Sequence, residues 1–120
     1  MPERYAAGIA GDRLNTVKLL ALEKELSGGT VEAYQPLLKA EARRVWELQQ
    51  SGALREIYFN SNQHTAVLVL ECASADEARR LLSGLPLVMA GLIEFEIVPL
   101  IPYDGFARLF DEATYCSPHK

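Results

Sequence analysis

The middle of the chain holds several side chains that can act as acids, bases or hydrogen-bond donors. His64 is the one histidine among residues 14–103, and histidine titrates near neutral pH, so it is a candidate general base. Tyr58 and Asn60 lie just before it and can donate hydrogen bonds to the oxyanion that forms when a proton leaves a carbon beside a carbonyl. A solvated turn histidine and an interface tyrosine without a ligand are the alternative interpretations.

Glutamates form the second group of candidates. A carboxylate that is buried on a sheet has a raised pKa and can serve as a base, whereas an exposed glutamate at a sheet edge has no such role. The glutamates on the predicted strands are Glu56, Glu71, Glu94 and Glu96. We therefore predict the catalytic residues His64, Tyr58 and Glu96, and the ligand-binding residues Asn60, Gln63 and Glu56.

Metal and thiol chemistry are not expected. Cys72 and Cys116 are far apart and show no CxxC or CxxH spacing, and His64 and His119 lack the spacing of metal ligands. Cys72 ends an apolar strand pattern, which favours a buried core cysteine over a nucleophile. We predict no metal and no cofactor.

Composition limits the class of protein. The chain has 120 residues, of which 49% are hydrophobic and 23% charged, which indicates one globular domain. A net charge of −4 argues against nucleic acid as a partner. The longest apolar run, residues 85–93, is too short to cross a membrane, and the N-terminus has no signal-peptide pattern. We expect a cytoplasmic protein without membrane contact.

The order of the predicted elements indicates the fold. Residues 54–60 and 65–72 read as a hairpin, a helix follows the Ser74–Glu77 capping box, and residues 93–100 form a strand after a Leu-Pro-Leu turn. Before them, residues 17–25 read as a strand and residues 34–50 as a helix that ends at Gly52. The predicted fold is α+β and ferredoxin-like, β-α-β-β-α-β, with an extension at 1–13, a domain at 14–103 and a C-terminal segment at 104–120.

The central strand predicts an assembly. Residues 65–70 are apolar on both faces, and two helices can cover only one of these faces. We expect a homodimer or higher homo-oligomer that forms a dimeric α+β barrel, unless a terminal segment folds over the open face. In the predicted hairpin register Tyr58 lies opposite Val67 and Glu56 opposite Val69, so these side chains share the open face with Asn60 and Glu96.

The C-terminal segment shows a helical pattern. Phe106, Leu109, Phe110 and Ala113 repeat at i, i+3, i+4 and i+7, which predicts a short amphipathic helix. Such a short helix is unstable alone, so we expect it to dock on its own domain or on a partner.

A resemblance to a known family runs through residues 17–100. The segments Glu47-Leu48-Gln49-x-x-Gly52-x-Leu54-Arg55, Leu85-Pro86-Leu87 and Ile93-Glu94-Phe95-Glu96-Ile97, with Gln63 in the hairpin, resemble the muconolactone isomerase family. The resemblance implies dimeric barrels, no cofactor, and proton transfer on an unsaturated lactone that carries a carboxylate. In this chain Leu19-Leu20-Ala21-Leu22 replaces the polar and basic first strand of the family.

These observations predict a cofactor-independent enzyme that transfers a proton on a small organic acid or lactone at the open sheet face. Two other functions stay open: a non-catalytic ligand-binding or regulatory dimer, and a cofactor-independent oxygenase on the same barrel.

Overall fold

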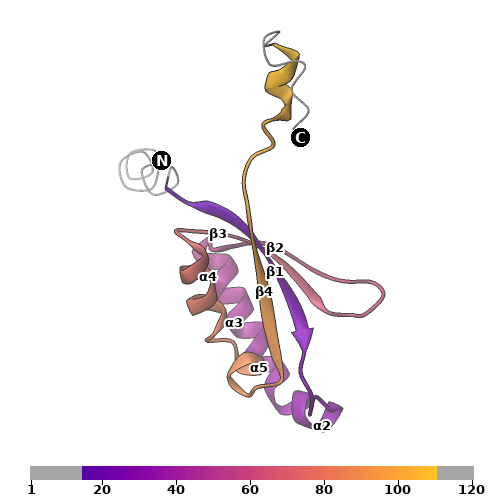
Figure 1. Cartoon of the computed structure of the whole chain (residues 1–120). Helices are drawn as coiled ribbons and strands as arrows, with labels where there is room; N and C mark the ends of the chain where they lie inside the picture. The colour runs from indigo at the N-terminus through magenta and orange to yellow at the C-terminus, as the bar shows by residue number, and fades with distance from the viewer. Residues whose placement is uncertain (1–14, 111–120) are drawn as a thin grey trace.

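The computed structural model describes residues 15–110, which form a four-stranded antiparallel sheet with helices on one face (Figure 1). The sheet order is β2-β3-β1-β4, which is the order of the predicted ferredoxin-like fold. The strands are β1 (Val17–Glu25), β2 (Leu54–Phe59), β3 (Ala66–Cys72) and β4 (Ile93–Leu100).

The hairpin has the predicted register. Tyr58 lies opposite Val67 and Glu56 opposite Val69. The register shifts between Leu54 and Glu56, so that Leu54 pairs with Leu70 and both side chains are buried. This irregularity adds one residue to β2 and lets the strand keep an apolar residue on the helix side at each end.

The first helical region is broken, whereas the sequence predicted one helix over residues 34–50. It consists of α2 (Val31–Tyr34), the 3-10 turn η2 (Gln35–Leu37) and α3 (Leu38–Ser51). Helix α2 begins three residues before the predicted start at residue 34, because the Thr30 side chain caps it by accepting a hydrogen bond from the Ala33 N–H. Pro36 lacks an N–H and lies within the turn. Helix α3 ends as predicted at Gly52, whose φ of 91° suits glycine.

The second helix, α4 (Ala75–Leu82), has the predicted cap. Ser74 Oγ accepts from the Glu77 N–H, and Glu77 Oε1 accepts from the Ala73 N–H at 2.7 Å. The predicted Leu-Pro-Leu turn is instead a short helix, α5 (Pro86–Met89). Proline is favourable at the first helical position, which explains why α5 begins there.

The core lies between the sheet and the two longer helices. Leu19 and Ala21 of β1 and Leu68 and Leu70 of β3 are buried, together with Leu48 of α3 and Ala78 and Leu82 of α4. The alternation along β1 and β3 therefore points one set of side chains to the helices.

The other sheet face carries the alternate set of side chains. Val67 and Val69 of β3 lie opposite Leu22 and Leu20 of β1, and all four are only partly buried in the single chain. Helices α3 and α4 both pack against the opposite face of the sheet, which holds the core (Figure 1). The predicted asymmetry of the sheet is thus present.

The C-terminal segment differs from the predicted amphipathic α-helix. Gly105–Leu109 form a 3-10 turn, η3, which stands beyond the end of β4 and away from the sheet (Figure 1). Phe106, Leu109 and Phe110 are 66%, 73% and 84% exposed, so they do not dock on their own domain. Their docking on a partner stays a prediction, and Ala113 lies outside the described residues.

Three further features concern residues 15–110 alone. Cys72 is buried in the core, and burial raises the pKa of its thiol. No group of three or more potential metal-ligating side chains comes together there, and no helix of that part is long and apolar enough to span a membrane. Cys116 and His119 lie outside the described residues.

Candidate functional site

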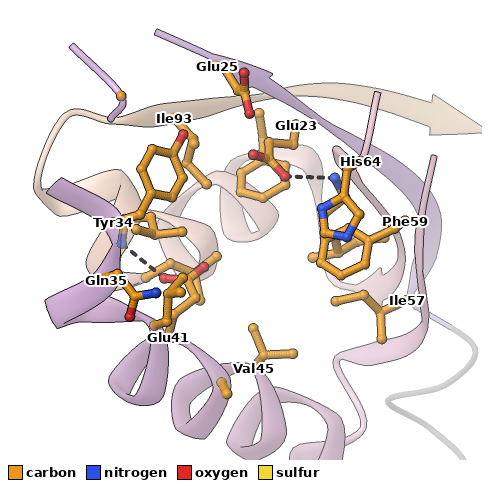
Figure 2. A pocket seen from close by; sticks show the side chains of 18 of the residues that line it. Glu23, Glu25, Tyr34, Gln35, Glu41, Val45, Ile57, Phe59, His64 and Ile93 are labelled. Carbon is orange, nitrogen blue, oxygen red and sulfur yellow. Dashed lines mark hydrogen bonds between the residues drawn. The ribbon is translucent and has the colours of Figure 1, made fainter. Parts of the chain in front are cut away.

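A cavity of about 640 Å³ lies between the helix-facing side of the sheet and the broken helical region (Figure 2). Its walls are mainly apolar, and the small side chains of Ala42 and Ala66 leave room between α3 and β3. A largely apolar cavity with a few polar groups is the usual form of a site for a small molecule. The polar side chains that line it are Glu23, Glu25, Thr30, Tyr34, Gln35, Glu41 and His64.

Glu23 is a carboxylate on the sheet floor of the cavity. It continues the inward alternation of Leu19 and Ala21 along β1, so its side chain points to the helices. Its Oε1 accepts a hydrogen bond from the Ala66 N–H at 2.6 Å, which fixes the carboxylate. Burial raises the pKa of Glu23, the Ala66 N–H opposes this, Glu25 raises it further and His64 lowers it.

Glu41 is the matching carboxylate on the helix side. It projects from α3, and its Oε1 accepts a hydrogen bond from the Leu87 N–H at 2.9 Å. Burial raises the pKa of Glu41, the Leu87 N–H lowers it, and Glu23 raises it. Glu23 thus acts on Glu41, and both carboxylates hold a proton more readily than an exposed glutamate does.

Tyr34 presents a hydroxyl that has no internal partner. Its oxygen is buried, and none of the described residues forms a hydrogen bond with it. Burial, Glu25 and Glu23 all raise the pKa of this phenol, so it stays protonated and can donate. Gly29 makes room for the ring, because a Cβ at that position would lie 2.8 Å from a Tyr34 ring carbon.

His64 lies at the mouth of the cavity, on the side opposite Tyr34 (Figure 2). Its ring stacks on Phe59 with centroids 4.0 Å apart. The hairpin turn positions it: Asn60 Oδ1 accepts from the Asn62 N–H, and the His64 N–H donates to the Asn60 carbonyl oxygen. His64 has a φ of 57°, a left-handed conformation in which histidine is enriched among non-glycine residues.

The structure brings His64 to the cavity but leaves other predicted site residues elsewhere. Tyr58 and Glu56 hydrogen-bond to each other on the open sheet face. Glu96 is on that face too and forms an ion pair with Lys24 at 3.4 Å. Asn60 uses its side-chain oxygen to hold the turn, and the exposed Gln63 donates its backbone N–H to that oxygen.

Sequence reasoning missed Glu23, Glu41 and Tyr34. Glu23 could have been found most easily, because it is a charged residue that follows Leu19 and Ala21 in the alternation of inward side chains along one strand. Glu41 lies beside the apolar stripe of its helix, which is a weaker signal. Tyr34 could not be placed, because its position depends on the break at Pro36.

A family model and one of two solved structures agree with this fold. The family model for muconolactone delta-isomerase matches residues 23–105. A crystal structure of muconolactone isomerase aligns with a TM-score of 0.58 and 17% identity, over 86% of this chain and 96% of that chain. A dimeric protein of unknown function with a ferredoxin-like fold, from Bacteroides fragilis NCTC 9343, aligns with a TM-score of 0.38 and 15% identity, over 72% and 97% of the chains. No curated protein matches the chain significantly.

Proposed function

Because the chain belongs to the muconolactone delta-isomerase family, we propose that it transfers a proton, without a cofactor, on a small organic acid or lactone. The observation that carries this proposal is the cavity itself. It has a fixed carboxylate, Glu23, on its mainly apolar wall, and the unpaired hydroxyl of Tyr34 lies buried behind that wall, where a rotation of the side chain would bring it to a ligand. These are the two groups that an enolisation needs: a base for the carbon acid and a donor for the oxyanion.

The proposed reaction shifts a double bond. Among the described residues no donor occupies Glu23 Oε2, so this oxygen can remove a proton from the carbon between the ligand carbonyl and its double bond. The electron pair moves into the carbonyl and gives a dienolate, whose oxygen accepts the Tyr34 hydrogen bond. The proton on Glu23 then returns to a different carbon, so the reaction conserves all atoms and needs no oxidant.

His64 is the second candidate for the base. It lies beside Glu23, lowers the pKa of that carboxyl, and stacks on Phe59, which also lines the cavity. A histidine there can also exchange a proton between Glu23 and solvent. Removing each side chain separately distinguishes these roles.

The open sheet face stays a second candidate for the site. Tyr58, Glu56 and Glu96 lie there, and Asn60 and Gln63 lie in the adjoining turn. A ligand between two sheets of a dimer would meet the first three groups. The cavity is the stronger proposal because its volume and its unpaired hydroxyl exist within one chain.

We also propose that two chains associate through the open sheet face. Leu20, Leu22, Val67 and Val69 form an apolar patch there, and pairing two such patches would remove it from water. A non-catalytic ligand-binding dimer would share this surface. The oxygenase alternative differs in requiring uptake of O2.

A deuterium-exchange experiment tests the proposed reaction. Unsaturated lactones are incubated with the protein in D2O, and NMR follows both deuterium incorporation and movement of the double bond. Tyr34→Phe should lower turnover about 10²–10³-fold, the usual effect of removing one oxyanion donor. Tyr58→Phe removes the same hydroxyl from the open face and should leave turnover nearly unchanged. No exchange with any lactone or small acid would contradict the enzymatic proposal.

A further inference from the structure

The carboxylate side chains that line the cavity give its wall a negative charge. Glu23, Glu25 and Glu41 line it, whereas no lysine or arginine of residues 15–110 does so. Among the described residues that line the cavity, His64 is the one basic side chain. A carboxylate ligand would therefore enter a space that already holds three acidic groups.

No ion pair within the described part of the chain neutralises these three glutamates. Lysines and arginines form their ion pairs with other acidic residues, as Lys24 does with Glu96 and Arg44 with Glu47. Negative charge thus remains at the cavity wall. Repulsion between like charges is strong where water is partly excluded, and a ligand carboxylate would also lose its hydration.

The protein's own carboxylates also occupy backbone donors that an anion would need. Glu41 takes the Leu87 N–H, and Glu23 takes the Ala66 N–H. A ligand carboxylate could reach these two backbone donors only by displacing a glutamate. An uncharged carbonyl oxygen loses less hydration than a carboxylate when it enters such a space, and the glutamates do not repel it.

We propose that the cavity selects uncharged lactones and rejects those that carry a carboxylate, with Glu41 as a specificity-determining residue. This inference rests on the proposed function and narrows its substrate class. It departs from the carboxylate-bearing lactone that the family resemblance implies. Glu41 is the discriminating group because it bears charge on the helix side, away from the proposed base.

The test uses two matched pairs of lactones. One pair is saturated and unreactive: a γ-lactone with a butyl chain, and the same lactone with a 3-carboxypropyl chain of equal length. The other pair is the β,γ-unsaturated version of each. Ligand-observed NMR measures binding of the saturated pair, and exchange in D2O measures turnover of the unsaturated pair.

The wild-type protein should bind the uncharged lactone at least about tenfold more tightly than its acid. Glu41→Gln should improve binding of the acid about tenfold relative to the uncharged lactone. Glu47→Gln is the matched control, because Glu47 lies on the same helix, is exposed and does not line the cavity. That control should alter neither affinity.

The outcomes separate this inference from the proposed function. Equal affinity for both saturated lactones, no binding of the uncharged one, or an equal effect of Glu41→Gln on both would overturn the selectivity. Selective binding without turnover of either unsaturated lactone supports the selectivity and rejects the enzyme. Equal turnover of both unsaturated lactones supports the enzyme and rejects the selectivity.

Discussion

Glu23→Gln should lower turnover of the substrate about 10²–10⁴-fold, the range expected when a general base is lost. The amide keeps the shape of the side chain and can still accept the Ala66 N–H bond, but it cannot take up a proton. Initial rates from NMR or absorbance measure the effect. Glu96→Gln is the matched comparison, because Glu96 is a strand glutamate on the open face.

The pH profile gives an independent check on Glu23. A base must be ionised, so kcat/KM of the wild-type protein should rise with pH through an apparent pKa above the ordinary 4.5 of a glutamate. His64→Gln should leave that ionisation in place if Glu23 is the base. If Glu96→Gln abolishes turnover while Glu23→Gln does not, the site lies on the open face.

Folding stability should show the same ionisation. Because the pKa of Glu23 is raised in the folded state, the folded chain binds more protons than the unfolded chain between the ordinary and the raised value. The free energy of unfolding therefore falls as pH rises through that window. The fall should be smaller in Glu23→Gln, and this comparison also verifies that the variant folds.

Val67→Asp combined with Val69→Asp should abolish the dimer. Both valines lie on the open sheet face, and burial of two unpaired carboxylates between sheets is strongly unfavourable. Sedimentation velocity at micromolar concentration should show a dimer for the wild type and a monomer of about 13.3 kDa for the double variant.

Val67→Thr with Val69→Thr is the control for that experiment. Threonine keeps the β-branched shape and the strand preference without adding charge, so most of the dimer should remain. Circular dichroism should show the same secondary structure in both double variants. An unchanged dimer in the aspartate variant would mean that chains associate elsewhere, and a monomeric wild type would refute the association.

The fold was largely predictable because its signals are local. The period-two pattern of β3 and the length of the loop between β2 and β3 predicted that Tyr58 lies opposite Val67. The Ser74–Glu77 spacing and Gly52 marked helix ends, where one side chain or one φ angle decides the outcome. The details around the prolines differed, because Pro36 and Pro86 each permit more than one kind of turn. The C-terminal segment differed too, since Gly105–Leu109 form a 3-10 turn in place of an α-helix.

The candidate site was less predictable because it depends on distant elements. His64 was identified from its chemistry, but the cavity it borders forms where η2 breaks the helical region opposite the sheet. No single segment encodes that space. Glu41 could not be recognised as a site residue, since only the tertiary structure brings the Leu87 N–H to its carboxylate.

The most direct test of the account is to locate a bound ligand by NMR. The uncharged butyl lactone is titrated into isotope-labelled protein, and the chemical shifts of methyl groups on the two sheet faces are compared. Binding in the cavity should give large, saturable shifts for Ile57 and Leu68, which line it, and little change for Val67 and Val69 on the open face. Shifts concentrated on Val67 and Val69, with Ile57 and Leu68 unchanged, would contradict it.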